Sequence, residues 1–170
     1  MAYRFEHTQL LRAEMSTLID FFSDVSNLDS NTPSFFRLQL LEGRPGGALE
    51  EGQTFSYRFT LFGISFPWVT HIDRVEATYF VDSQQRGVYK SFRHLHAFYP
   101  SEHGTLMVDR LDYELPFLFL NPVVNTLAVR PMLEAIFRYR ALQAVRCIRR
   151  PARPRGFRWR RVRGGRRGRS

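Results

Sequence analysis

The chain has 170 residues, a formal net charge of +9 at pH 7 and one cysteine, Cys147. This length suits a single domain that buries about two thirds of its unfolded surface without a crosslink, and a lone thiol excludes an internal disulfide framework and a thiolate zinc cluster. Because no apolar run reaches about eighteen residues and charged side chains interrupt residues 1–25, we expect neither a membrane-spanning helix nor a secretory signal, and a cytoplasmic location.

Residues 3–11, YRFEHTQLL, open the chain with near alternation of apolar and polar side chains, which predicts a strand. A helix is expected next, with Ser16 as its N-terminal cap, because apolar residues then recur at helical spacing. These residues are Leu18, Ile19, Phe22 and Val25. The turn-forming residues 29–33, DSNTP, end the helical pattern.

Between Phe35 and Leu115 the sequence changes to short runs bounded by turn-forming residues. The runs are FFRLQLLEG, TFSYRFTLFG, FPWVTHIDRVEA, YFVDSQQRG, VYKSFRHLHAFYP and TLMVDRLDYEL. The breaks GRPGG, FGI, QQRG and SEHG are short and mostly rich in glycine, which favours hairpins over parallel strands joined by helices. We therefore predict six consecutive antiparallel strands.

Residues 115–129, LPFLFLNPVVNTLAV, are apolar but interrupted by asparagine and proline. We interpret them as a loop whose Phe117 to Leu120 pack beneath the following helix. The alternative is a mobile mouth through which a lipid enters while the segment touches a membrane.

The last predicted element is a long amphipathic helix. Its opposite face carries Arg130, Glu134 and Arg138 at mutual i, i+4 spacing. Pro131 marks either its start or a kink, because proline disfavours the α conformation in the residue before it. The predicted apolar face consists of Ala128, Met132, Ala135, Ile136, Tyr139 and Leu142.

The order of these elements predicts an α+β fold in which a curled antiparallel seven-stranded sheet wraps around the long C-terminal helix. A seven-stranded sheet twists and curls, and a helix across its concave side leaves space that side chains do not necessarily fill. We therefore expect a pocket beneath the helix.

Three stretches resemble the START-like superfamily, also called SRPBCC or the polyketide cyclase and coenzyme Q-binding group: residues 21–33, residues 80–98, and residues 105–117 with 132–140. More narrowly, the chain resembles a bacterial branch of uncharacterised ligand-binding proteins. The resemblance implies the helix-grip fold and a cavity for a lipid, quinone or polyketide, used for transport, sensing, cyclisation or presentation. It implies no shared catalytic set. Val88 and Arg93 depart from the family's usual residues, which weakens any inference about one particular ligand.

Two histidines one residue apart, His94 and His96, are the main candidates for chemistry. Strand alternation places them on one face with Phe92 and Phe98. The more apolar face of the last strand is expected to point the same way, and Phe80, Asp82 and Gln84 to join it from the preceding strand. The predicted ligand-binding residues are His94, His96, Phe98, Phe80, Asp82, Met107, Asp109, Leu111, Tyr113, Met132, Ile136 and Tyr139.

Three roles remain open for these histidines. They line a binding pocket or form a structural hydrogen-bond pair without catalysis, they act with Asp109 as general acid or base in a cyclase or dehydratase, or they bind a metal with Asp109 or His71. The chain has no nucleophile elbow, phosphate-binding glycine loop or HExxH motif. We favour a binding module for a hydrophobic small molecule, with an enzyme as the alternative, and expect no metal, cofactor or obligate protein partner.

The positive charge is concentrated at the end of the chain. Eleven arginines and no acidic residue lie from Arg149 onward, which leaves the remainder with a net charge of −2. We predict a ligand-binding domain over residues 1–148 and a disordered tail over residues 149–170. Its arginines, interleaved with Phe157 and Trp159, are typical of segments that contact anionic membranes or nucleic acid, and a solvated extension without a partner is the alternative.

Overall fold

The computed structural model describes residues 1–149 except 29–30, 34, 44–47 and 62, so nearly all of the predicted tail lies outside the described residues. Seven strands form one antiparallel sheet in the order β1-β7-β6-β5-β4-β3-β2. The sheet is open, with β1 and β2 at its edges. The strands are β1 (Ala2–Leu11), β2 (Phe36–Glu42), β3 (Thr54–Leu61), β4 (Ile64–Glu76), β5 (Tyr79–Arg86), β6 (Ser91–Ser101) and β7 (Gly104–Glu114).

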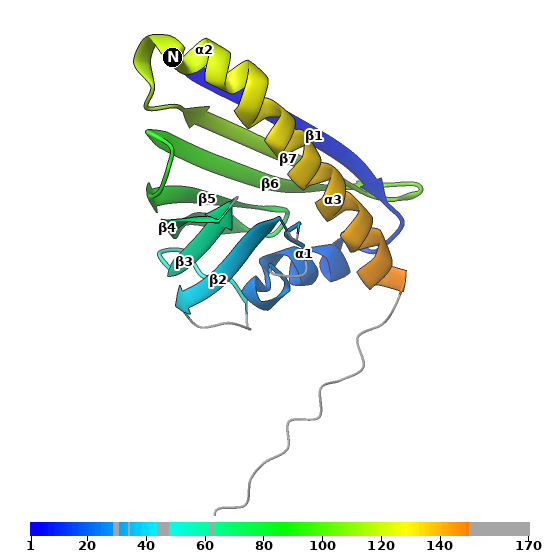
Figure 1. Cartoon of the computed structure of the whole chain (residues 1–170). Coiled ribbons are helices and arrows are strands. Elements are labelled where there is room, and N and C mark those ends of the chain that lie inside the picture. Colours follow the sequence, from blue (N-terminus) through cyan, green and yellow to red (C-terminus); the bar gives the residue numbers. More distant parts are fainter. Residues whose placement is uncertain (29–30, 34, 44–47, 62, 150–170) are drawn as a thin grey trace, which may run out of the picture.

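The long helix α3 (Arg130–Arg149) crosses the concave side of this sheet, and α1 (Met15–Ser23) lies near the helix's C-terminal end (Figure 1). Six strands follow one another as hairpins, and β1 joins the far edge of the meander beside β7. This arrangement confirms the predicted α+β helix-grip fold with a curled seven-stranded sheet. The strand predictions are confirmed to within a few residues, whereas α1 begins at Met15 after Glu14, without the predicted Ser16 cap.

The strands that hold the candidate residues are paired without a shift in register. β6 and β7 pair continuously from Ser91 opposite Glu114 to Ser101 opposite Gly104. On β7 every second side chain is buried, from Met107 through Asp109 to Tyr113. The predicted inner faces of both strands are therefore the observed ones, because no bulge inverts the alternation between them.

The predicted loop at 115–129 is wrong from Asn121 onward, because this segment is helical. After a 3₁₀ turn, η2 (Leu118–Leu120), the chain forms α2 (Asn121–Val124) and a π-helical turn, η3 (Asn125–Val129), which runs directly into α3. Asn121 is buried, accepts a hydrogen bond from the Phe117 N–H, and donates its amide to the Leu115 carbonyl, 3.0 Å away. Asn121, which interrupts the apolar pattern in the sequence, thus fixes the start of the helical segment through these two hydrogen bonds.

The π-helical turn precedes Pro131 and accommodates it. Arg130 keeps a helical conformation, with φ −61° and ψ −49°, and its N–H donates to the Asn125 carbonyl five residues back. Proline has no N–H and its ring crowds the carbonyl four residues before it, so a wider turn at this point relieves that conflict. Pro131 therefore neither starts the helix nor ends it.

The buried face of α3 also differs from the predicted face. Ala128 and Ala135 are exposed, and Leu142 is 61% exposed. Met132 and Ile136 are half-buried at the margin of the observed face. The charged side chains of Arg130, Glu134 and Arg138 are exposed, as predicted for the opposite face. The buried residues are Val129, Leu133, Phe137 and Ala144.

The core is divided by the position of the helix. One cluster joins Phe5 on β1 and Leu111, Tyr113 and Leu115 at the β7 side to three residues of the helical segment, Val129, Leu133 and Phe137. A second packs α1 against Phe80, Phe98 and Met107, and a third lies under β3 and β4. Among the described residues, no helix is long and apolar enough to cross a membrane.

Candidate functional site

A cavity of about 440 Å³ lies between the sheet and α3. Its volume is within the range of about 300–1,000 Å³ that holds small-molecule ligands in proteins. Its wall is mainly aromatic and aliphatic. The aromatic side chains that line it come chiefly from β3, β4 and the following strands, and are Phe36, Phe55, Tyr57, Phe59, Phe66, Trp68, Phe80, Tyr89, Phe92, Phe117 and Phe137, with Phe22 from α1.

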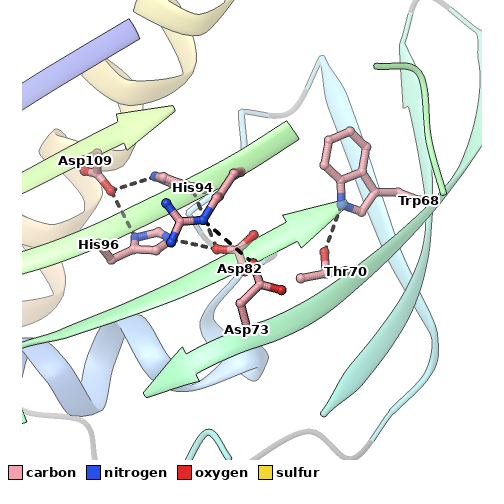
Figure 2. Close-up of polar contacts among 8 residues, drawn as sticks. Trp68, Thr70, Asp73, Asp82, His94, His96 and Asp109 are labelled. Atoms are coloured by element: carbon pink, nitrogen blue, oxygen red, sulfur yellow. Dashed lines mark hydrogen bonds and ion pairs between the residues drawn. The ribbon is translucent and has the colours of Figure 1, made fainter. Parts of the chain in front are cut away.

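The aromatic wall is packed by ring contacts along its length. Phe59 stacks on Phe66, with centroids 5.1 Å apart, and lies edge-on to Trp68 at 5.9 Å. The Trp68 indole N–H is satisfied by Thr70 Oγ1 at 2.9 Å, as Figure 2 shows. Because the one polar atom of this indole bonds within the protein, the ring presents an apolar surface to the cavity.

One part of the cavity wall is strongly polar. Three adjacent strands there bring acids and histidines together: Asp82 on β5, His94 and His96 on β6, and Asp109 on β7. In the strand register Asp82 lies directly opposite His94, and Asp109 lies directly opposite His96. We call these four residues the His–Asp cluster. Its members come together because all four belong to the inner face of the sheet.

The hydrogen bonds of the cluster run diagonally across the strand pairs (Figure 2). His94 Nε2 lies 3.1 Å from Asp109 Oδ1, and His96 Nε2 lies 3.1 Å from Asp82 Oδ2. The remaining ring nitrogens face the other carboxylate: His96 Nδ1 is 3.0 Å from Asp109 Oδ1, and His94 Nδ1 is 3.9 Å from Asp82 Oδ2. Each imidazole therefore has one nitrogen towards Asp109 and the other towards Asp82.

Neighbouring rings hold both imidazoles. The two histidine rings have centroids 3.7 Å apart, and Phe80 stacks on His96 at 4.2 Å. Phe137 of α3 contacts His94 edge-on at 5.6 Å. Packing on both sides restricts ring rotation, so the side chains are preorganised for whatever they bind.

The cluster shifts the pKa values of its members in different directions. Burial, helped by the charge of His96, lowers the pKa of His94 to about 4. Burial also acts to lower the pKa of His96, but its contacts with Asp109 and Asp82 outweigh burial and raise it above the ordinary value. Near neutral pH His94 is therefore neutral, and His96 is the imidazole of the pair that binds a proton more readily.

The two carboxylates are ionised in this setting. Burial acts to raise the pKa of Asp109, but hydrogen bonds from both histidines outweigh it and hold the pKa well below the usual range. Burial likewise acts to raise the pKa of Asp82, and the hydrogen bond from His96 together with the nearby positive charges lowers it instead. The carboxylates of Asp82 and Asp109 thus accept the hydrogen bonds of the cluster, and the histidine N–H groups donate them. With one protonated imidazole, the cluster retains one net negative charge.

Arg140 of α3 is a cation that acts on this charge, because it lowers the pKa of Asp82 electrostatically and lines the same cavity. Its guanidinium lies 5.3 Å from the ring centroid of Phe137 and 5.9 Å from that of Phe22. The buried Nε has no hydrogen-bond partner among the described residues. Arg140 is thus held by aromatic faces, with donor capacity to spare.

The predicted ligand-binding residues divide into two groups. His94, His96, Phe80, Asp82, Leu111, Met132 and Ile136 line the cavity. The other five do not: Asp109 lies behind the histidines, and Phe98, Met107, Tyr113 and Tyr139 are not part of the cavity wall. Tyr113 donates a 2.6 Å hydrogen bond to the Asn125 side chain in the π-helical turn, so its hydroxyl is engaged in fixing the helix. Gln84 bonds the backbone of Tyr89.

Sequence reasoning missed several lining residues. Leu133, Phe137 and Arg140 were absent from the predicted set because the apolar face of the helix was placed one residue away. Two i, i+4 series, Met132 with Ile136 and Leu133 with Phe137, are both apolar. Spacing alone does not show which of them faces the sheet. Tyr57, Phe59, Phe66 and Trp68, on β3 and β4, also line the cavity and were not among the predicted ligand-binding residues.

A third histidine, His7, was also missed. It lies on β1 directly opposite Asp109 and packs against Phe137 with ring centroids 5.7 Å apart. Its Nδ1 is buried and has no hydrogen-bond partner within the described part of the chain. The alternation YRFEHTQLL contained the signal, because it places His7 on the same face as Phe5.

Within the described part of the chain, Asp82, His94 and His96 form a group that could hold a metal ion, because one donor atom from each lies within 4.8 Å of the others. His71, the alternative third ligand considered from the sequence, instead contacts Thr54 of the neighbouring strand at 3.4 Å. Asp109 contacts the far side of both imidazoles.

A helix gripped by a curled sheet, with an apolar cavity and a buried polar cluster between them, defines a START-like ligand-binding protein. The chain belongs to the family described as polyketide cyclase/dehydrase and lipid transport, which matches residues 11–137. Membership of this family, together with the cavity, supports binding of a hydrophobic ligand in general terms. Among curated proteins none matches the chain in sequence.

Solved structures share the fold at low sequence identity. Protein CV1439 from Chromobacterium violaceum superposes with a TM-score of 0.66 at 11% identity, covering 86% of this chain and 97% of that one. TTHA0849 from Thermus thermophilus gives 0.62 at 16%, covering 86% and 98%. The di-domain ARO/CYC StfQ from the steffimycin biosynthetic pathway gives 0.67 at 14%, covering 87% of this chain and 51% of that one. This chain thus spans about half the length of StfQ.

Proposed function

We propose that this protein binds a hydrophobic or amphipathic small molecule, such as a lipid, a quinone or a polyketide, for transport, sensing or presentation. The observation that carries the proposal is the cavity of about 440 Å³ beneath α3, whose wall is mostly aromatic and aliphatic and polar only around the His–Asp cluster and Arg140. Apolar burial supplies affinity in such a site, and a few polar groups set orientation.

The polar part of the wall favours a ligand with a polar end. Arg140 offers a cationic N–H group, Nε, that has no hydrogen-bond partner among the described residues, and His94 offers a ring nitrogen, Nδ1, that makes no hydrogen bond in the cluster. A carboxylate, phenolate or carbonyl oxygen of the ligand would accept a hydrogen bond from Arg140, and a ligand hydroxyl group would donate one to His94 Nδ1. The apolar body of the ligand then lies along Phe59 and Trp68.

Exposed apolar side chains lie in the segment that leads into α3. Phe117 lines the cavity and is half exposed, whereas Phe119 is 84% exposed and Leu127 75% exposed. These exposures oppose the interpretation in which Phe117 to Leu120 pack beneath the helix. We propose that this exposed apolar surface, the mouth, is where a ligand enters from a membrane or another carrier.

A blocking substitution tests the binding proposal. Ile136→Trp adds an indole to the cavity wall, and Ala135→Trp adds the same group to the exposed side of the same helix. With anilinonaphthalene sulfonate as the probe, we expect Ile136→Trp to weaken binding about tenfold or more and Ala135→Trp to leave it unchanged. Equal affinity in both variants would show that the probe binds elsewhere. Native mass spectrometry of the purified protein would then identify a co-purifying ligand.

An enzyme of the cyclase or dehydratase type is the second candidate, and the orientation of His94 favours it. Because Nε2 of this neutral histidine donates to Asp109, the lone pair on Nδ1 is free to accept a proton from a substrate in the cavity. Replacing His94 with Gln separates the two functions. A binding protein keeps most of its affinity, whereas a proton-transfer catalyst loses turnover by about a hundredfold or more.

A further inference from the structure

The geometry points to a divalent transition-metal site formed by His94, His96 and Asp82 at the polar wall of the cavity. The proposal goes beyond the binding of a hydrophobic molecule and does not depend on it. The metal is the ligand under test, and it can be titrated by itself.

The three donor groups already converge. His96 Nε2 and Asp82 Oδ2 are 3.1 Å apart, and His94 Nδ1 and Asp82 Oδ2 are 3.9 Å apart. Ligand atoms around a tetrahedral zinc ion are separated by about 3.3 Å, given metal–ligand bonds of about 2.0–2.1 Å. Small rotations of the side chains therefore bring the three atoms to bonding distance of one ion, and β5 and β6 need not move.

Asp109 provides a carboxylate that contacts the nitrogen of each histidine facing away from the proposed metal. Its Oδ1 is hydrogen-bonded to His94 Nε2 at 3.1 Å. The same oxygen lies 3.0 Å from His96 Nδ1, which makes no hydrogen bond among the described residues and is near enough to donate after a small rotation of the ring. Metal-bound histidines typically donate their second N–H to a carboxylate, which fixes the tautomer and ring orientation. Here this contact leaves His94 Nδ1 and His96 Nε2 directed towards Asp82.

The charges of the cluster also suit a divalent ion. As metal ligands both imidazoles are neutral, so Asp82 and Asp109 contribute two negative charges in a largely apolar surrounding. A divalent cation balances these two charges, and it replaces the direct hydrogen bond between His96 and Asp82 with two bonds to the metal. Arg140 is the opposing charge, because its guanidinium acts on Asp82 from α3.

The donor types indicate which metals fit. Two imidazoles and one carboxylate suit Zn²⁺, Fe²⁺, Co²⁺ or Ni²⁺, whereas Mg²⁺ and Ca²⁺ prefer all-oxygen sites. Because all three ligands line the cavity, the remaining coordination positions face the space in which a small molecule binds. A bound metal would thus coordinate an oxygen atom of that molecule or a water.

The test uses the untagged full-length chain after treatment with a chelator. Co²⁺ and Zn²⁺ are titrated by calorimetry, and the visible absorption of the Co²⁺ form is recorded. We expect one ion per chain. Asp109→Asn should weaken binding about 10- to 100-fold, and His94→Gln, His96→Gln and Asp82→Asn should each weaken it further. His103→Gln, at an exposed hairpin position, is the matched control and should bind as the wild type does.

Two measurements keep the result decisive if a variant does not fold. X-ray absorption of the wild-type Zn²⁺ form should show two imidazoles and oxygen ligands without sulfur, which excludes Cys147 and other adventitious sites. Arg140→Gln leaves all three ligands in place and should tighten binding several-fold, because it removes the opposing charge. The proposal is overturned if wild-type protein binds no stoichiometric ion at micromolar concentrations, or if folded His94→Gln or His96→Gln binds it unchanged.

Discussion

Asp82 accepts a hydrogen bond from His96 at 3.1 Å, although the residue directly opposite Asp82 in the β5–β6 register is His94. Asp109 repeats this diagonal pattern from the other side of β6, since it lies opposite His96 and bonds His94. The cluster is thus a product of register across three strands. A slip of one residue in either pair would turn a whole set of side chains to the outer face.

Asp109 is expected to contribute strongly to stability. Its removal in Asp109→Ala leaves two buried histidines without their shared acceptor, and breaking a buried pair costs about 3–5 kcal/mol. We expect a loss of about 3 kcal/mol in the free energy of unfolding, measured by urea denaturation. Asp112→Ala is the control on the same strand, because its ion pair with Arg4 is exposed to solvent and contributes little to stability. Similar losses in both variants would contradict the buried ion-pair network.

The pKa of His94 predicts a loss of stability in mild acid. Because burial holds this pKa at about 4, the unfolded chain binds a proton at this residue below its ordinary pKa of about 6.5, while the folded protein does not. Stability should therefore fall as the pH drops from about 6.5 towards 4. Thermal melts of chelator-treated protein across this range should show a shallower fall for His94→Gln than for wild type. Parallel curves for the two proteins would show that His94 is not the titrating group.

The other members of the cluster act in different pH ranges. The raised pKa of His96 contributes stability below its unfolded value, and this contribution is lost as the pH rises through the folded pKa. The lowered pKa values of Asp82 and Asp109 contribute stability above their unfolded values, and this is lost as the pH falls through the folded values. His96→Gln should therefore remove a decline in stability that wild type shows as the pH rises above the ordinary histidine pKa of about 6.5, measured by thermal melts.

Phe137 should be the most sensitive position on α3. It is 3% exposed, contacts Phe5 with centroids 5.4 Å apart, and also packs on His94. Phe137→Ala is expected to cost about 3–5 kcal/mol. Leu142→Ala, further along the helix and 61% exposed, should cost less than about 0.5 kcal/mol. A larger loss of stability in Leu142→Ala than in Phe137→Ala would instead support the buried helix face that was predicted from the sequence.

Arg140 should select for acidic ligands. If its free N–H groups pair with an anionic end, Arg140→Gln will weaken binding of a long-chain carboxylate about tenfold and leave binding of the matching alcohol nearly unchanged. Competition with a fluorescent probe measures both affinities in the same assay. Equal losses for acid and alcohol would assign Arg140 a packing role only.

The mouth should control the rate of transfer. Phe119→Ser and Leu127→Ser remove exposed apolar surface without touching the cavity wall. We expect uptake of a fluorescent lipid from anionic vesicles to slow several-fold while the equilibrium affinity in detergent stays the same. The exposed Glu134→Ser variant of α3 serves as the control. A fall in affinity equal to the fall in rate would place these residues in the binding site.

The sequence by itself determined the strands, the long helix and the fold, but not the helical turns between Asn121 and Val129. Alternation and turn residues located the strands, and helical spacing located α3. The pair His94 and His96 identified a polar site on an otherwise apolar strand face. These features are local, because period and turn chemistry are properties of neighbouring residues. The inner face of β7 followed from the same alternation, since no bulge interrupts its pairing with β6.

Tertiary structure alone decided which residues meet. The partners of His94 and His96 depend on the relative register of β5, β6 and β7, and this placed Asp82 beside the histidines on the cavity side and Asp109 behind them. The helix face depended on the π-helical turn before Pro131 and on which of two apolar series fits the sheet, so Phe137 and Arg140 emerged only from packing. Local pattern fixes which side of an element is apolar to within about one residue, whereas a site requires the position of each side chain relative to distant strands.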